Sequence, residues 1–381
     1  MKGWKLFTIK DITNNLDNKR IPLNSSQRAK KESNPIYPYI GANNIMGYID
    51  EFIFDEKILC LAEDGGSWGY NQKCAVIYNE KVWVNNHAHV LTAKENLVLE
   101  YLMYYLNFTD LNLYINGATR GKLTQSSLNS IQIPLPPLDV QQKIASILDA
   151  ADTLRQKDKA LLAKYDELTQ ALFLDMFGDP VSNPMGWEKV ELKKFGAIKT
   201  GNTPSRKDES NYSVNHIEWL KTDNIVQELL YVTNAKEYLS ATGLSNARFV
   251  EEGALLVACI AGSIKSIGRA ALTDRKVSFN QQINAIQPNS TVDSLFLYYL
   301  FKSAITHIQD FASNGMKRML TKGVFEKIQM IKPPIYLQTQ FAERVAIIEH
   351  QKTQAQASLE KSEELFNSLL QKAFKGELIE S

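Results

Sequence analysis

The chain carries one plan twice, and this duplication constrains its fold more than any other feature of the sequence. Leu123-Thr124 recurs as Leu320-Thr321, and Pro136-Pro137 recurs as Pro333-Pro334, in both cases 197 residues further along. The same offset continues through the stretches that follow the two proline pairs. Matches that share one register over this distance indicate an internal repeat, so each half of the chain is expected to have the same architecture.

The first part of each repeat, residues 1–138 and 179–335, has the composition of a globular domain. Both segments are rich in glycine, asparagine, aromatic and β-branched residues. Apolar runs such as 57–61 and 254–260 are typical of strands between turns. Helical patches lie between these runs. The sequence therefore predicts two tandem α+β domains.

The second part of each repeat, residues 139–178 and 336–381, follows a proline pair and predicts a long helix. Apolar residues recur there in steps of three and four over about five heptads, so each helix is on the order of 55 Å long. The predicted seam consists of Ile144, Leu154, Asp158, Leu161 and Leu168 in the first helix, and Phe341, Ile348, Lys352, Leu359 and Phe366 in the second.

Such apolar stripes are unstable in water, so we expect the two helices to pack on each other as an antiparallel pair with pseudo-two-fold symmetry. They then resemble a coiled coil and separate the two domains. Asp158 and Lys352 are the charged seam positions, and we expect them to face each other and fix the orientation of the pair. The alternative is that each helix lies on its own domain.

Charge is balanced over the whole chain, with 43 Lys and Arg against 42 Asp and Glu. A uniformly basic protein that coats DNA is therefore excluded. The two globular segments carry net charges of +1 and +4, whereas each helical segment carries −2. The positive excess therefore lies in the globular segments, which leaves a locally basic face open there, and the acidic helices suit a protein partner better than phosphates.

Sequence signatures of catalysis are missing. No Gly-x-Gly-x-x-Gly or Gly-x-x-x-x-Gly-Lys-Ser/Thr motif occurs. The Pro-Pro pairs lack the polar and aromatic neighbours with which adenine methyltransferases hold a flipped base. His87 and His89 share one face of a strand, but no third metal ligand is evident. We therefore expect a binding protein and not an enzyme.

The cysteines and the hydropathy pattern bear on the compartment. Cys60, Cys74 and Cys259 have no metal-ligand spacing and cannot pair evenly, which favours a reducing compartment. No apolar run approaches the roughly 20 residues that span a bilayer. Residues 1–7 lack the apolar core of a secretory signal. We expect a cytoplasmic protein without membrane attachment.

The order of motifs resembles a known family. The relevant segments are 37–50, 199–205 and 219–224, the Gly-to-Leu-Thr stretches 117–124 and 315–321, and the helix starts at Gln141-Gln142 and Gln338. In this order and duplication, they are similar to the specificity subunit of type I restriction–modification enzymes. The resemblance covers essentially the whole chain.

This resemblance implies a non-catalytic DNA-binding subunit for host defence. Residues 1–138 and 179–335 would be target-recognition domains, each reading one half of a bipartite, asymmetric DNA site. Residues 139–178 and 336–381 would be the central and distal spacer helices, which dock two modification subunits. Those subunits bind S-adenosylmethionine and methylate adenine at N6. The full complex adds restriction subunits that use ATP and Mg²⁺, so no cofactor or metal is expected in this chain.

Two sets of residues are candidates for DNA contact. Amide, hydroxyl and basic side chains can read base edges; the base-reading candidates are Asn43, Asn44, Ser67, Asn85, Asn86, His87, Thr222, Asn224, Ser263, Lys265, Asn280, Gln281 and Gln282. The phosphate candidates are Arg120, Lys122, Lys317, Arg318 and Lys322. The alternatives are turn-forming amides for the first set and a solvated loop for the second.

Other functions compete with this interpretation. A close one is the recognition subunit of another multisubunit restriction system. A second is a nuclease or methyltransferase that acts alone, against which the missing motifs count. A third is a helical adaptor whose domains bind protein. Unlike a DNA reader, an adaptor would show no salt-dependent DNA binding.

Overall fold

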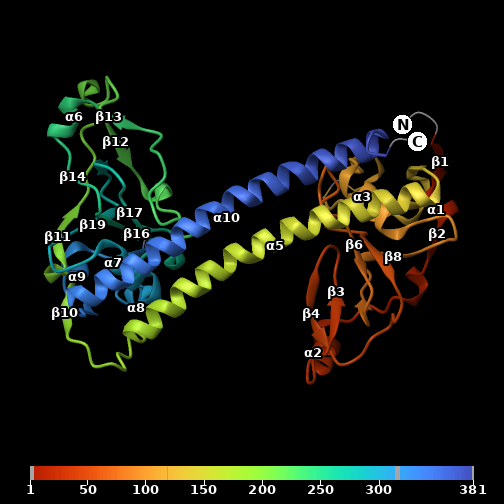
Figure 1. Ribbon diagram of the computed structural model, residues 1–381, viewed down its shortest axis with the longest axis horizontal. Coiled ribbons are helices and arrows are strands. Elements are labelled where there is room, and N and C mark those ends of the chain that lie inside the picture. Colours follow the sequence, from red (N-terminus) through yellow and green to blue (C-terminus); the bar gives the residue numbers. More distant parts are fainter. Residues whose placement is uncertain (1–3, 118, 314–317, 380–381) are drawn as a thin grey trace. The chain divides into compact units, whose positions relative to one another are not determined.

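The computed structural model describes residues 4–117, 119–313 and 318–379 (Figure 1). It divides into two compact units. Unit 1 comprises residues 1–160 and 356–381, and unit 2 comprises residues 161–355. Two long helices, α5 (Leu138–Phe177) and α10 (Ile335–Lys375), contribute to both units. Among the described residues, no helix is long and apolar enough to cross a membrane.

Unit 1 is built on an antiparallel sheet of order β2-β8-β5-β6, with bounds Thr13–Asn15, Ala88–Ala93, Ile58–Ala62 and Ala75–Tyr78. A second sheet has the order β4-β3-β7 (Ile45–Ile49, Tyr37–Ile40, Trp83–Val84), and β1 pairs with β9 (Lys5–Thr8, Gln132–Leu135). The helices are α1 (Ile9–Ile12), α2 (Ser25–Lys31), α3 (Leu99–Phe108) and α4 (Gln125–Ser130), with short 3-10 turns at Asp17–Lys19 and Asn112–Tyr114.

Unit 2 repeats this plan. Its main sheet has the order β11-β19-β15-β17, with bounds Gly196–Thr200, Ile283–Pro288, Leu255–Ala258 and Ala270–Leu272. The second sheet has the order β13-β12-β18-β14 (Tyr238–Leu239, Ile217–Leu220, Val277–Phe279, Phe249–Val250). Two strand pairs are β10-β21 (Lys189–Glu191, Gln329–Ile331) and β16-β20 (Ile260–Ala261, Arg318–Met319).

The helices of unit 2 also follow the plan of unit 1. They are α6 (Ala241–Ser245), α7 (Ser294–Ser303), α8 (Ile305–Asp310) and α9 (Lys322–Phe325), with 3-10 turns at Leu192–Lys194, Glu209–Asn211, Thr222–Asn224 and Ile264–Ser266. In each second sheet one pair is parallel, β3 with β7 and β12 with β18. The predicted mixture of helix and sheet in two tandem domains is therefore confirmed.

One inner strand of each main sheet, β5 or β15, has an unbroken apolar sequence because it is buried on both faces. In β5, Leu59 and Leu61 face the core that contains α3, whereas Ile58 and Cys60 face a second core. Strand β15 divides its side chains between two cores in the same way. Each domain thus has a sheet layer between a helical layer and the smaller sheet.

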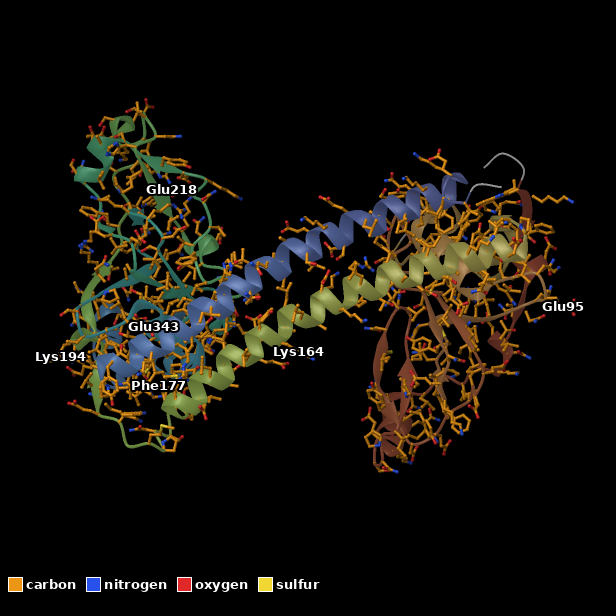
Figure 2. All side chains as sticks on the ribbon, in the orientation of Figure 1. Glu95, Lys164, Phe177, Lys194, Glu218 and Glu343 are labelled. Carbon is orange, nitrogen blue, oxygen red and sulfur yellow. The ribbon has the colours of Figure 1, made fainter. Side chains whose placement is uncertain are left out.

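Both long helices pack on the domain of each unit and on each other. In unit 1, Ile144 and Leu148 of α5 share a core with Phe366 and Phe374 of α10 and with α3. In unit 2, the ring of Phe173 lies 5.6 Å from that of Phe341, centroid to centroid. Phe177, labelled in Figure 2, is the last residue of α5 and is also fully buried. Each long helix therefore packs both on the other helix and on a domain, so both expected arrangements are present.

Within each unit the helix pair is antiparallel, but the predicted seam needs correction. In unit 1, Lys159 pairs with Glu363 at 2.9 Å, and the guanidinium of Arg155, four residues earlier on α5, lies over the ring of Phe366. Ile144, Asp158, Phe341, Leu359 and Phe366 are buried as predicted, while Ile348 and Lys352 are half-buried. In contrast, Leu154, Leu161 and Leu168 are 45%, 40% and 51% exposed.

The buried stripe on α5 alternates differently from the predicted one. It shares Ile144 and Asp158 with the predicted stripe. Elsewhere it contains Leu148, Ala151 and Thr169, and the exposed Leu168 lies directly beside Thr169. The cause is that the helix must bury one side against the domain and another against its partner helix. An apolar pattern in steps of three and four fits both stripes equally well.

The expected pairing of Asp158 with Lys352 is wrong. In unit 1, Asp158 accepts a hydrogen bond from the Ser358 hydroxyl at 3.4 Å. In unit 2, the Lys352 ammonium lies 2.7 Å from an Asp166 carboxylate oxygen. Asp166 is eight residues beyond Asp158 on α5, which is more than two helical turns. Each charged seam residue therefore has a partner that the seam pattern did not indicate.

Candidate nucleic-acid interface

Two loops that are distant in the sequence lie side by side in unit 1. One follows β5, and the other precedes α4. The Leu123 N–H donates to the Glu63 carbonyl oxygen at 2.7 Å, and the Gly65 N–H donates to the Gly121 carbonyl oxygen at 3.3 Å. We call residues 63–69, 116–117 and 119–124 together the loop edge of unit 1.

Unit 2 has a matching loop edge, formed by residues 259–269 and 318–324. The Leu320 N–H donates to the Cys259 carbonyl oxygen at 2.8 Å, as Leu123 does to Glu63 in unit 1. Strands β16 and β20 place Arg318 opposite Ala261. In each unit the Gly-to-Leu-Thr stretch therefore meets the loop that follows an inner strand of the main sheet, although the separation of the two segments in the sequence does not require it.

The repeated Leu-Thr pair fixes the end of the second loop. Leu123 and Leu320 are buried in the cores of their units. The Thr124 hydroxyl accepts the Ser127 N–H at the start of α4, and the Thr321 hydroxyl caps α9 in the same way. Threonine is a favoured N-cap because its oxygen satisfies an amide that the helix leaves free. The motif thus anchors the loop and starts a short helix.

The amide triplets lie in turns at the start of β8 and β19. Asn85 is buried, and its Oδ1 accepts the His87 N–H at 2.7 Å. Asn280 is also buried, and its Oδ1 accepts the Gln282 N–H at 3.0 Å. The turn-forming alternative therefore accounts for the first amide of each triplet. The side chains exposed to solvent to a large or intermediate degree are those of Asn86, His87, Gln281 and Gln282.

The remaining base-reading candidates are placed differently. Asn44 is exposed in the turn between β3 and β4, whereas the Oδ1 of Asn43 is buried, and no donor among the described residues reaches it. Asn224 is held locally, because its Oδ1 accepts the Lys221 N–H at 2.9 Å. Thr222 is half-buried in the same turn. The exposed candidates on the two loop edges are Ser67, Ser263 and Lys265.

The predicted phosphate contacts are engaged with carboxylates in unit 1. The Arg120 guanidinium lies 2.7 Å from Asp64, and the Lys122 ammonium lies 3.0 Å from Glu63. In unit 2, Lys322 pairs with Glu326 one helical turn away, and Arg318 is half-buried in β20. Lys317 lies outside the described residues. The structure therefore brings the unit 1 cations to the loop edge but also gives each a local anion.

A buried ion cluster beneath the loop edge of unit 1 was missed by the sequence analysis. The Arg20 guanidinium lies 2.6 Å from Glu63 and 3.5 Å from Asp17. His89 places Nδ1 2.6 Å from an Asp17 carboxylate oxygen and Nε2 2.8 Å from the Leu123 carbonyl oxygen. The cluster therefore connects a strand of the main sheet to the second loop of the edge.

The cluster has donor atoms that could hold a metal ion, but only His89 of the two histidines belongs to it, because His87 contacts Asp64 instead. Ligand atoms of Asp17, Glu63 and His89 lie within 4.8 Å of one another, a spacing that suits a metal ion. The Arg20 guanidinium already bonds Glu63 and the Ala88 carbonyl oxygen in this space. Because an internal cation balances the carboxylates, the arrangement is a satisfied ion cluster and fits no metal.

Opposing effects set the ionisation of the two cluster carboxyls. Burial raises the pKa of Asp17, but the hydrogen bond and the charge of His89 together hold it below its usual value. Burial likewise raises the pKa of Glu63, but Arg20 and Lys122 together lower it. Both carboxylates are therefore charged in the neutral range. The only sequence signal for the cluster was a histidine inside an apolar strand.

Unit 2 carries a small cleft beside its second sheet. The cleft has a volume of about 200 Å³ and is lined by Trp219, Lys221, Asp223, Asn224, Thr233, Asn234, Lys236 and Glu237. The Arg206 guanidinium lies over the rings of Tyr212 and Trp219, with its carbon 4.5 and 4.9 Å from their centroids. Lys221 and Arg206 both pair with Glu237. The 3-10 turn Thr222–Asn224 therefore borders a polar cleft with one aromatic wall.

A model of the type I restriction modification DNA specificity domain matches residues 1–164 and 184–361 of the chain. A putative type I restriction enzyme specificity subunit of Haemophilus influenzae is 28% identical over 348 residues, which cover 87% of this chain and 83% of that protein. The HindI specificity subunit of the same organism is 29% identical over 155 residues, covering 39% of this chain and 32% of that protein.

Solved structures share the fold. A type I restriction–modification S subunit from M. genitalium aligns over 97% of this chain and 96% of its own, with a TM-score of 0.63 and 14% identity. A structure from the type I restriction–modification system aligns over 99% of both chains, with a TM-score of 0.55 and 15% identity. The family match spans most of the sequence and both repeats. The chain therefore belongs to the DNA specificity subunits of type I restriction–modification systems.

Proposed function

We propose that each unit reads one half of a bipartite, asymmetric DNA site through its loop edge. The observation that carries this proposal is the duplicated loop edge: one backbone arrangement in both units, with different side chains on it. In unit 1 the edge presents Ser67, Arg120 and Lys122, whereas in unit 2 it presents Ser263 and Lys265. Because base readout depends on side chains, the two half-sites differ.

The chain is a specificity subunit and not an enzyme, so the chemistry belongs to its partners. We propose that α5 and α10 dock two modification subunits, which bind S-adenosylmethionine and methylate adenine. Restriction subunits that use ATP and Mg²⁺ complete the assembly in the cytoplasm. One related solved structure comes from work on complex assembly of the type I system, which supports a partner-bound state.

Exposed apolar side chains on the long helices support docking. In unit 2, Leu161 and Leu168 of α5 and Ile347 of α10 are 40%, 51% and 67% exposed. In unit 1, Leu154 of α5 and Leu365 of α10 are 45% and 47% exposed. Apolar residues at heptad spacing on an exposed helix face are typical of a helix-binding surface. The predicted seam residues Leu154, Leu161 and Leu168 thus mark the face of α5 that we assign to partners.

Methylation mapping tests the proposal. The chain is expressed with its modification subunit in a host that lacks other adenine methylation, and methylated adenines are located by single-molecule sequencing. We expect one bipartite motif with two unlike halves. Exchange of residues 179–335 for the corresponding segment of a related subunit should change one half only. A complex that assembles but methylates no defined motif would contradict the proposal and favour an adaptor.

A further inference from the structure

Arg120 is held at the loop edge by a carboxylate that also holds a base-reading candidate. Asp64 Oδ1 lies 2.7 Å from Arg120 Nη2 and 2.7 Å from His87 Nδ1. The Asp64 side chain is 17% exposed, whereas that of Arg120 is 64% exposed. One N–H of the guanidinium is therefore fixed in the protein, and most of the group faces solvent.

The backbone is shaped for this contact. Gly65 has a φ of +63°, and a Cβ at this position would lie 2.9 Å from Arg120 Nη2. Residue 65 therefore leaves room for the guanidinium, in a conformation that glycine adopts at little cost. The strand-like bridges of Lys122 to Asp64 and to Asn116 hold the neighbouring backbone in place. Asp64 thus orients the Arg120 guanidinium, and the missing side chain of Gly65 leaves the space that it occupies.

The charge around Arg120 distinguishes two kinds of DNA contact. A phosphate that approaches Arg120 also approaches the Asp64 carboxylate, which repels it. The acceptors of a guanine edge belong to a neutral base, so this repulsion is much smaller. Lys122 differs, because its carboxylate partner Glu63 is already bonded by Arg20. Because Arg20 already compensates the charge of Glu63, Glu63 repels a phosphate beside Lys122 less strongly.

We propose that Arg120 reads a guanine in the half-site of unit 1 and that Asp64 is its positioning residue. The guanidinium has five N–H groups in a planar fork, and one is used by Asp64. A pair of the others matches N7 and O6 of guanine in the major groove. This assignment replaces a phosphate contact by base readout. It rests on the proposed function, because it requires unit 1 to read DNA.

The test compares four complexes of the full chain with its modification subunit: wild type, Arg120→Ala, Asp64→Asn and Lys122→Ala. Binding to duplexes carrying every single substitution of the mapped motif is measured at several salt concentrations. With Arg120→Ala, we expect discrimination at one G·C pair in the unit 1 half to fall about five- to 150-fold, the worth of one bidentate pair. The other positions should keep their preferences.

Asp64→Asn separates positioning from simple charge. We expect discrimination at the same G·C pair to fall, because the guanidinium loses its fixed orientation, while affinity for altered sites stays equal or rises. Lys122→Ala is the matched phosphate control, and it should weaken binding to all sequences and reduce the salt slope by about one. If Arg120→Ala behaves like Lys122→Ala, or Asp64→Asn tightens all sequences without changing preference, the inference is overturned.

Failure of this inference is distinguishable from failure of the proposed function. If the wild-type complex recognises no defined site, the proposed function fails and the inference fails with it. If the wild type recognises a site and Arg120→Ala keeps every base preference, only the guanine assignment fails. Thermal unfolding of each complex shows whether a variant has lost its fold, and the conservative Arg120→Lys supplies a folded variant that keeps charge without the fork.

Discussion

Gln141 and Gln338 make the same three hydrogen bonds, one residue in each unit. The Oε1 of Gln141 accepts the Val98 N–H at 2.9 Å, and its Nε2 donates to two backbone carbonyl oxygens, those of Asn96 and Pro136. Gln338 bonds Asp293, Thr291 and Pro333 in the same pattern. Both side chains are buried. Each long helix is therefore tied by its first turn to the helix start of its own domain.

Replacement of this glutamine should destabilise the chain. Gln141→Leu leaves a buried N–H and two carbonyl oxygens without their partner, so we expect the free energy of unfolding to fall by about 2–4 kcal/mol. Urea unfolding followed by circular dichroism measures the change. The neighbouring Gln142 is exposed, and Gln142→Leu is the matched control with a change within about 0.5 kcal/mol. Equal effects of both variants would contradict the anchoring role.

The two loop edges differ in how much they need glycine. Gly65 has a φ of +63°, whereas the φ of Gly262 lies outside the left-handed region, and a Cβ there would meet nothing within 4 Å. We expect Gly65→Ala to lower the free energy of unfolding by about 1–2 kcal/mol, the cost of a left-handed conformation for alanine. Gly262→Ala should leave it unchanged or slightly higher. Thermal unfolding of both variants measures the contrast, and a larger loss for Gly262→Ala would refute it.

The ion cluster of unit 1 predicts a pH dependence. Asp17 and Glu63 have lowered pKa values in the folded chain, so their contribution to stability is complete above the pKa of the unfolded chain. It is lost as the pH falls through the lower, folded value. We expect the free energy of unfolding to be steady above about pH 5 and to fall below about pH 4. Unfolding by urea between pH 3 and pH 7 measures this.

Glu63→Gln tests the assignment of that acid transition. The variant should be less stable at pH 7, because Arg20 and Lys122 lose their anion, and its stability should fall less on acidification. Glu95 is exposed, so Glu95→Gln is the control and should keep the wild-type curve. A Glu63→Gln variant with an unchanged acid limb would show that other carboxyls cause the transition.

The repeat, the two mixed domains and the long helices could be predicted because each depends on local sequence pattern. The seam of α5 was predicted only in part. The heptad pattern identified the buried Ile144 and Asp158, but the pattern fits two stripes of the helix. Burial against the domain selects the stripe that does not contain Leu161. The contacts of the loop edge could not be predicted. Asp64 and Arg120 are 56 residues apart, and only the sheet topology brings them together.

The buried seam carboxylate of Asp158 is a further case in which environment matters more than pattern. Asp158 is 8% exposed, and the Ser358 hydroxyl lies 3.4 Å from each of its carboxylate oxygens, which makes only long hydrogen bonds. Because desolvation of a carboxylate is costly, Asp158→Leu should raise the free energy of unfolding by about 1 kcal/mol or more. Asp175 on the same helix is exposed, so Asp175→Leu is the control, with little change. Urea unfolding distinguishes them, and a loss of stability in Asp158→Leu would contradict this account.

A substitution at an exposed leucine of α5 in unit 2 distinguishes an effect on partner binding from an effect on the stability of the fold. Leu168 is 51% exposed, so Leu168→Asp should leave the free energy of unfolding within about 0.5 kcal/mol of wild type. If this face binds a modification subunit, a charge there must be desolvated on docking, and we expect binding to weaken at least about tenfold. Ala163 is exposed on the opposite side of the helix, and Ala163→Asp supplies the same charge as a control. Calorimetric titration with the modification subunit measures both variants; equal affinities for Leu168→Asp and wild type would place the docking surface elsewhere.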